Sequence, residues 1–141
     1  MTTELSFVTV TLQILAGVLL AAGVVYAIKV YSQKIQLAIT AAVLLVAVLI
    51  YVLLALFSGN PVFVAIEIIG LLLFLFLIGL GYRYTLWFVV MGWILHVLWD
   101  VGLHPAQTAP YVPQWYAWLC VGFDVVMAFY MGGLLVRYQY K

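Results

Sequence analysis

Charged residues are scarce in this sequence. Five lysines or arginines and four acidic residues are spread over 141 positions, whereas a soluble domain carries about a quarter charged residues. The mean hydropathy is +1.31, and 70% of the residues are hydrophobic. These values exclude a water-soluble globular domain. The net charge of only +1 leaves no basic surface for DNA or RNA, so no nucleic-acid partner is expected.

The motifs of common soluble enzymes are missing as well. Cys120 is the single cysteine, so the chain cannot form an internal disulfide. There is no P-loop, no dinucleotide-binding fingerprint and no CxxC pair. The N-terminal sequence carries Glu4 where a signal peptide has positive charge, and the apolar run behind it is longer than a signal-peptide core. We therefore interpret this run as an uncleaved membrane span.

Long apolar runs are what the sequence does contain. A helix needs about 20 residues to cross the roughly 30 Å hydrocarbon layer, and five segments reach that length. The turn-forming cluster Ser58-Gly59-Asn60-Pro61 separates the second segment from the third. The sequence predicts an all-α fold in a single transmembrane domain, residues 1–141, forming a compact bundle of five helices at about 5–28, 35–57, 61–81, 84–104 and 114–136.

All positive charges fall on one side of this predicted bundle. Lys29 and Lys34 flank the first loop, Arg83 lies in the third, and Arg137 and Lys141 follow the last helix. The positive-inside rule makes that side cytoplasmic. We therefore expect the N-terminus outside and the C-terminus in the cytoplasm. The expected location is the cell membrane, namely the inner (cytoplasmic) membrane of a prokaryote.

Small residues form one face of the first predicted helix. Gly17 and Ala21 are four positions apart and suit close packing of two helices. A dimer contact is one use of such a face, and the general abundance of small residues in membrane helices is the simpler explanation.

The stretch Trp93–Pro105 contains both histidines, His96 and His104, with Asp100 midway between them. Spacings of four place all three on one stripe of a helix. Ionisable groups in such apolar surroundings are costly, so each is a functional-site hypothesis. At 1.5 Å per residue, Asp100 lies about 6 Å and His96 about 12 Å below the outer end of the helix.

Other polar residues fall at overlapping depths in the same outer half. Glu67 and Cys120 lie about 9 Å down their helices, and Asp124 about 15 Å. If these faces point inward, they form one cluster with His96 and Asp100 that opens toward the outside. Such a cluster has to be neutralised by its own members, a metal ion, protons or water.

A metal site is the sharpest interpretation of that cluster. A histidine and a carboxylate at positions i and i+4 of a helix can bind one ion together. His96 and His104 are about 12 Å apart along a straight helix, although Pro105 disfavours helical conformation at His104. Nitrogen and carboxylate ligands suit a divalent transition metal, Zn²⁺ first, and also iron or manganese. The predicted metal ligands are His96, Asp100, His104 and Asp124.

A bound zinc ion with an open coordination position would activate water. Because the site lies within the outer half of the bilayer, its substrate would be a lipid or an amphiphile. Glu67 is the predicted catalytic residue, as a general base. The predicted function is therefore that of an integral membrane protein that binds a metal ion and acts as a metal-dependent hydrolase.

Several alternatives do without catalysis. The cluster could be a hydrogen-bonded polar plug that fixes helix register, at about 1 kcal/mol per bond. It could serve a proton or ion path, although the inner half has almost no ionisable residue to continue one. A haem could bind to one histidine, or between subunits. The main alternative is a non-catalytic accessory subunit of a larger respiratory or transport complex, with the cluster used for packing, quinone contact or proton handling. The expected partners are membrane lipids and either further copies of the chain or such a complex.

The last two predicted helices carry a family resemblance. The elements H-V-L-W-D-V-G-L-H-P (96–105) and V-P-Q-W-Y-A-W-L-C-V-G-F-D (112–124) resemble small bacterial membrane proteins of the DUF6010 type, a family defined by a domain of unknown function. The resemblance covers the final third of the chain and implies no activity. It differs in having a single histidine before Pro105, where some relatives carry a pair. It implies that one family motif contains His96, Asp100, His104, Cys120 and Asp124.

Overall fold

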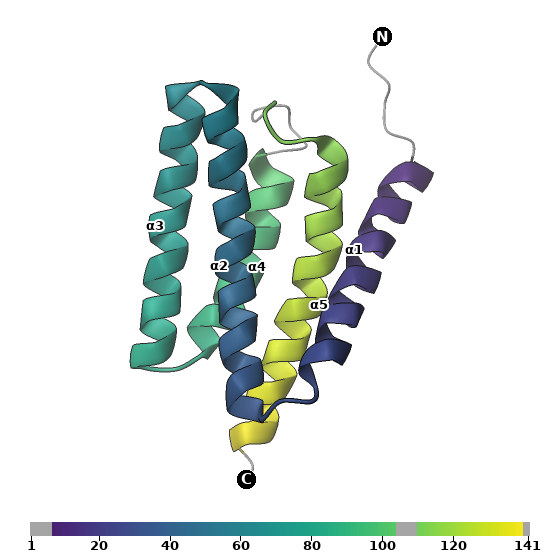
Figure 1. Ribbon diagram of the computed structural model, residues 1–141, viewed down its shortest axis with the longest axis vertical. Helices are drawn as coiled ribbons and strands as arrows, with labels where there is room; N and C mark the ends of the chain where they lie inside the picture. Colours follow the sequence, from purple (N-terminus) through teal and green to yellow (C-terminus); the bar gives the residue numbers. More distant parts are fainter. Residues whose placement is uncertain (1–6, 104–109, 140–141) are drawn as a thin grey trace.

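The computed structural model describes residues 7–103 and 110–139. All regular structure in these ranges is helical, which confirms the all-α prediction. The chain runs through the five helices shown in Figure 1: α1 (Phe7–Ile28), α2 (Gln33–Ser58), α3 (Pro61–Arg83), α4 (Trp87–Leu103) and α5 (Gln114–Gln139).

Four of these helices, α1, α2, α3 and α5, are long and apolar enough to cross a membrane. Helix α4 has 17 residues, which corresponds to about 25 Å. It begins at Trp87 rather than at Tyr84, and His104, the expected last residue of that span, lies outside the described residues. The fourth segment is therefore a short apolar helix packed among four longer ones.

The turn between α2 and α3 has the form that its sequence predicts. Gly59 adopts a left-handed conformation with φ 68°, and its N–H donates to the carbonyl of Leu56 at 3.1 Å. The side chain of Asn60 accepts a hydrogen bond from the N–H of Val62 at 2.9 Å. Pro61 is the first residue of α3, where its missing N–H costs nothing. Each residue of the cluster thus ends one helix or starts the next.

The connections place the ends of the helices in two groups. The α1–α2 and α3–α4 connections lie at the end of the bundle where α5 finishes, while the α2–α3 turn lies at the end where α1 begins (Figure 1). Lys29, Lys34, Arg83 and Arg137 consequently lie at one end. We call this the cationic end of the bundle.

The apolar core lies among α2, α3, α4 and α5. Leu44, Phe74, Trp93, Met127 and Met131 are each exposed by 1% or less. Large apolar side chains also cover much of the outer surface; Phe129, for example, is 79% exposed. A bundle that is apolar both inside and outside fits a lipid environment.

Helix α1 lies at the edge of the bundle and packs on α5 (Figure 1). Added Cβ atoms show how close the two backbones are. A Cβ at Gly17 would overlap the carbonyl group of Leu119, and one at Gly122 would overlap that of Ile14. The small-residue face of α1 therefore packs within the chain, and Ala21 is fully buried there. Only glycine allows this approach, because any side chain would meet backbone atoms.

Candidate metal centre

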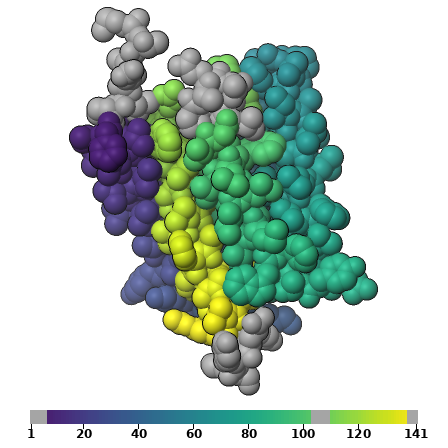
Figure 2. All heavy atoms as spheres, turned by 180° about the vertical axis from the view of Figure 1, so that it is seen from behind, coloured from purple at the N-terminus to yellow at the C-terminus, as the bar shows by residue number. Residues whose placement is uncertain are grey.

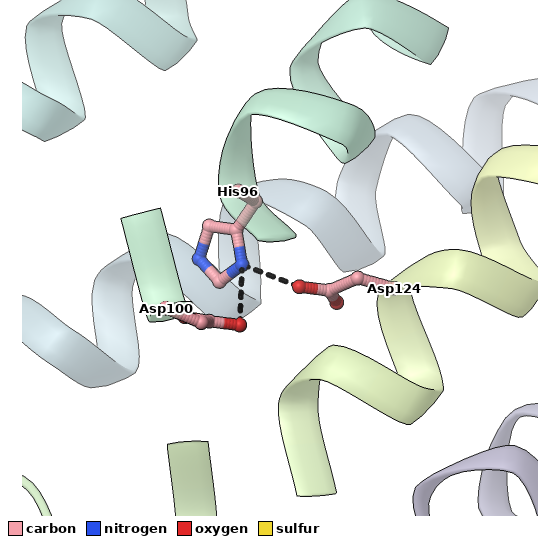
Figure 3. A group of neighbouring side chains, drawn as sticks. All are labelled: His96, Asp100 and Asp124. Atoms are coloured by element: carbon pink, nitrogen blue, oxygen red, sulfur yellow. Dashed lines mark hydrogen bonds and ion pairs between the residues drawn. The ribbon is translucent and has the colours of Figure 1, made fainter. Parts of the chain in front are cut away.

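His96 and Asp100 of α4 and Asp124 of α5 meet in the interior of the bundle (Figure 3). The Nδ1 atom of His96 lies 2.6 Å from Oδ2 of Asp124 and 3.6 Å from Oδ2 of Asp100. One ring nitrogen therefore faces two carboxylates. We call these three residues the polar triad.

Helical spacing explains why these side chains point inward. On α4, the buried residues Val89 and Trp93 continue into His96 and Asp100 at steps of four, three and four. Such steps follow one face of an α-helix. Asp124 lies on the matching buried face of α5, which also holds Cys120 and Met127. The polar triad thus occupies positions that an apolar core residue would otherwise fill.

The polar triad is closed off from solvent. His96 and Asp100 are 0% exposed and Asp124 is 1% exposed. The imidazole ring lies between two aromatic rings, with its centroid 5.4 Å from that of Tyr51 and 5.3 Å from that of Phe74. These rings exclude water from the imidazole and strengthen every electrostatic interaction around it.

Several polar atoms of the polar triad have no hydrogen-bond partner within the described residues: Nε2 of His96, both carboxylate oxygens of Asp100 and Oδ1 of Asp124. Figure 3 shows Nε2 pointing away from both carboxylates. A buried polar group without a partner typically costs about 1–3 kcal/mol, and two buried carboxylates side by side repel one another. The polar triad therefore needs further neutralisation by a cation or by protons.

The geometry fits a metal ion. One ligand atom from each residue lies within 4.8 Å of the other two. Two ligands of a tetrahedral zinc ion are about 3.3 Å apart, given bond lengths near 2.0–2.1 Å. The 3.6 Å separation between His96 and Asp100 is close to that spacing. The 2.6 Å separation between His96 and Asp124 would have to open by about 0.7 Å, which a side-chain rotation can supply.

Glu67 lies in the same half of the bundle but is not a member of the polar triad. It is 1% exposed. Its carboxylate accepts a hydrogen bond from Nε1 of Trp99 at 3.3 Å and one from the hydroxyl of Tyr111 at 2.5 Å. Tyr111 precedes α5, and burial and then the neighbouring Glu67 raise the pKa of its phenol above the ordinary value. Glu67 therefore connects α3 to α4 and to the segment that leads into α5.

The other candidates from the sequence are placed as follows. Cys120 is buried beside Tyr51, Val112 and Ala117, next to the polar triad but not part of it. His104 lies outside the described residues. The single cluster expected from the sequence is therefore divided, with the polar triad in one group and Glu67 in another. Depth counting identifies residues at one level but not the direction in which each helix faces.

Three aromatic residues of this region were not singled out from the sequence as site residues. Tyr51 packs on the imidazole of His96, and Trp99 and Tyr111 donate to Glu67. The available signal was weak, because tyrosine and tryptophan are common near the ends of membrane helices. Tyr51 lies seven residues before the end of α2, which is deeper than an interfacial aromatic belt requires.

We expect Tyr111→Phe to lower the free energy of unfolding by about 1–2 kcal/mol, because Glu67 loses the hydroxyl donor that reaches it at 2.5 Å. Thermal unfolding in detergent, followed by circular dichroism, measures this loss. Tyr84→Phe is the matched control, since Tyr84 is 70% exposed at the opposite end of the bundle. Equal effects of the two substitutions would contradict the hydrogen-bonded role of Tyr111.

Comparison of the chain with protein-family models, curated proteins and solved structures gives no match. The resemblance of the last two helices to the DUF6010 type therefore stays a prediction. The function has to be inferred from the arrangement of the chain's own residues.

Proposed function

We propose that this chain is a multi-pass membrane protein that binds one divalent transition-metal ion at His96, Asp100 and Asp124. The observation that carries the proposal is the convergence of three buried ligand atoms within 4.8 Å in the interior of an apolar bundle. One imidazole and two carboxylates suit zinc, iron or manganese. Zinc is the first candidate, because it accepts a tetrahedral set of nitrogen and oxygen ligands.

Charge balance supports a cation at this place. With neutral His96, the two carboxylates of the polar triad carry two negative charges in a site from which water is excluded. Within the described residues, no lysine or arginine forms an ion pair with either carboxylate. A divalent ion would neutralise both charges, and the carboxylate oxygens that lack hydrogen-bond partners would bind it as ligands.

The proposal also includes an orientation. The polar triad and Glu67 lie toward the end of the bundle opposite Lys29, Lys34, Arg83 and Arg137. By the positive-inside rule, the cationic end faces the cytoplasm and the metal site lies in the outer half of the cell membrane. The depth of the polar triad, counted in residues from the ends of α4 and α5, supports this placement.

An enzymatic use of the site would be hydrolysis of a lipid or an amphiphile, with the metal ion supplying the activated water. Ligand chemistry and the position in the membrane support this extension of the proposal. Glu67, the candidate general base, already accepts two hydrogen bonds. Because the three ligands are exposed by 1% or less, a substrate would reach them only after a movement of α4 relative to α5.

A second candidate function is favoured by one contact. The 2.6 Å separation between His96 Nδ1 and Asp124 Oδ2 is that of a strong hydrogen bond. Protons shared among the polar triad would neutralise it without a metal ion. The chain would then be an accessory subunit of a larger membrane complex, with the polar triad handling protons or fixing the packing of α4 on α5.

Metal analysis of the purified protein separates the two candidates. We expect about one equivalent of metal per chain, bound at least 10-fold more weakly in Asp100→Asn and in Asp124→Asn, because each change removes an anionic ligand but keeps the side-chain shape. Glu67→Gln is the matched control: it converts another buried carboxylate to an amide outside the polar triad, and it should keep its metal. A folded wild-type chain that takes up no zinc, iron or manganese would favour the subunit.

A further inference from the structure

A groove runs between α1 and α5 at the cationic end of the bundle. It encloses a cavity of about 600 Å³. Val25 and Val126 contribute to its apolar part, and Tyr26 and Tyr130 lie farther toward the helix ends. Lys29, which directly follows α1, and Arg137 of α5 line the same groove where it reaches the cationic end. The groove therefore combines an apolar channel with two positive charges at one end.

A second groove follows the other side of α5. It has a volume of about 440 Å³ and lies between α4 and α5, with an apolar lining that includes Val90, Ile94 and Val125. Phe129 and Gly133 line both grooves. In Figure 2, α5 is the yellow band between α1 and α4 on this face of the molecule. Two apolar channels thus flank one exposed strip of α5.

The two cations of the first groove have no anionic partner within the described residues. Lys29 and Arg137 are both exposed, and neither takes part in an ion pair there. Glu67, Asp100 and Asp124 all lie toward the opposite end of the bundle. An anion bound between these cations would therefore come from outside the described residues.

We propose that the groove between α1 and α5 binds one anionic phospholipid. Its phosphate lies between Lys29 and Arg137, and one acyl chain follows the apolar channel toward Val126. From Val126 to Arg137 the groove follows about 16 Å of α5. The second acyl chain lies across Phe129 in the groove between α4 and α5. Basic pockets between membrane helices are known to bind anionic headgroups. This site is separate from the polar triad and does not depend on a metal ion.

The test is native mass spectrometry of the detergent-solubilised chain with phosphatidylglycerol or with phosphatidylcholine of the same acyl chains. We expect a clear preference for phosphatidylglycerol. The variant Lys29→Gln/Arg137→Gln should lose about 25-fold in affinity for phosphatidylglycerol, at about fivefold for each cation. Its affinity for phosphatidylcholine should change little. Inorganic phosphate should not displace the lipid, because it cannot fill the apolar channel.

Two matched controls separate a specific site from general surface attraction. Lys34→Gln/Arg83→Gln removes the same charge from the cationic end, away from the groove, and should keep the preference. Gly133 lines both grooves, and a Cβ there meets no atom within 4 Å, so the groove has room for a larger side chain. Gly133→Leu would occupy that room and should weaken binding of both lipids. Gly79→Leu makes the same change in open space on α3 and should have no effect.

Three results would overturn the proposal. The first is equal binding of the two lipids by the wild-type chain. The second is an equal loss in the two double-charge variants, which would mean that only the general surface charge matters. The third is unchanged lipid binding in Gly133→Leu, which would place the lipid elsewhere. Size-exclusion chromatography and circular dichroism show that each variant is folded before its lipid binding is compared.

Discussion

We expect His96→Leu to lower the free energy of unfolding by about 3–5 kcal/mol relative to the wild-type chain. The substitution removes the imidazole whose Nδ1 atom faces both carboxylates, and it leaves Asp100 and Asp124 without this partner in a site exposed by 1% or less. Like charges in an apolar interior repel strongly, and no lysine or arginine pairs with them within the described residues. Unfolding by a denaturing detergent, in buffer with a chelator and followed by circular dichroism, measures the loss.

A triple variant shows what this loss means. We expect His96→Leu/Asp100→Ala/Asp124→Ala to regain at least half of the lost stability, because apolar groups replace all three members of the polar triad together. This result would mean that the polar triad is not required for folding and is present for binding or proton chemistry. A triple variant as unstable as His96→Leu would instead show that its polar contacts hold α4 on α5.

The second large effect is expected at the contact between α1 and α5. Gly17→Ala should destabilise the chain by about 1–3 kcal/mol, because its Cβ would overlap the backbone carbonyl of Leu119. The carbonyl belongs to a helix and cannot move aside as a side chain can. Loss of a disulfide cross-link between cysteines introduced into α1 and α5 would report the separation of the two helices.

Gly23→Ala provides a control of opposite sign. Gly23 lies on the same helix, and a Cβ there would meet no atom within 4 Å. Replacing glycine by alanine in a helix then stabilises it by up to about 1 kcal/mol. If both substitutions change the stability in the same direction, the effect of Gly17→Ala does not come from the close approach of α1 to α5.

Several features of the fold can be predicted from the sequence because they depend on local chemistry. The apolar runs predict helices, and Ser58 to Pro61 predicts the turn between α2 and α3, since glycine and proline restrict the backbone whatever surrounds them. The meeting of His96, Asp100 and Asp124 was also expected, from residue spacing on α4 and from depth counted along α4 and α5. These quantities follow from the fixed geometry of a helix.

Other features cannot be predicted in this way, because they depend on how the helices are rotated and paired. Glu67 has the expected depth, but its carboxylate accepts hydrogen bonds from Trp99 and Tyr111. No local sequence pattern specifies these two donors. The pairing of Gly17 with Leu119 joins positions about a hundred residues apart. The sequence shows that α1 has a small-residue face, but not which helix covers it.

The position of α1 has a consequence for synthesis in the cell. Helix α1 leaves the ribosome before α2, α3 and α4, while its main partner, α5, leaves after them. During the time that α2, α3 and α4 are made, the glycine face of α1 remains in contact with lipid or with the insertion machinery. A chain truncated before α5 would leave this face without its partner. Completion of α5 is thus the step that joins α1 to the rest of the bundle.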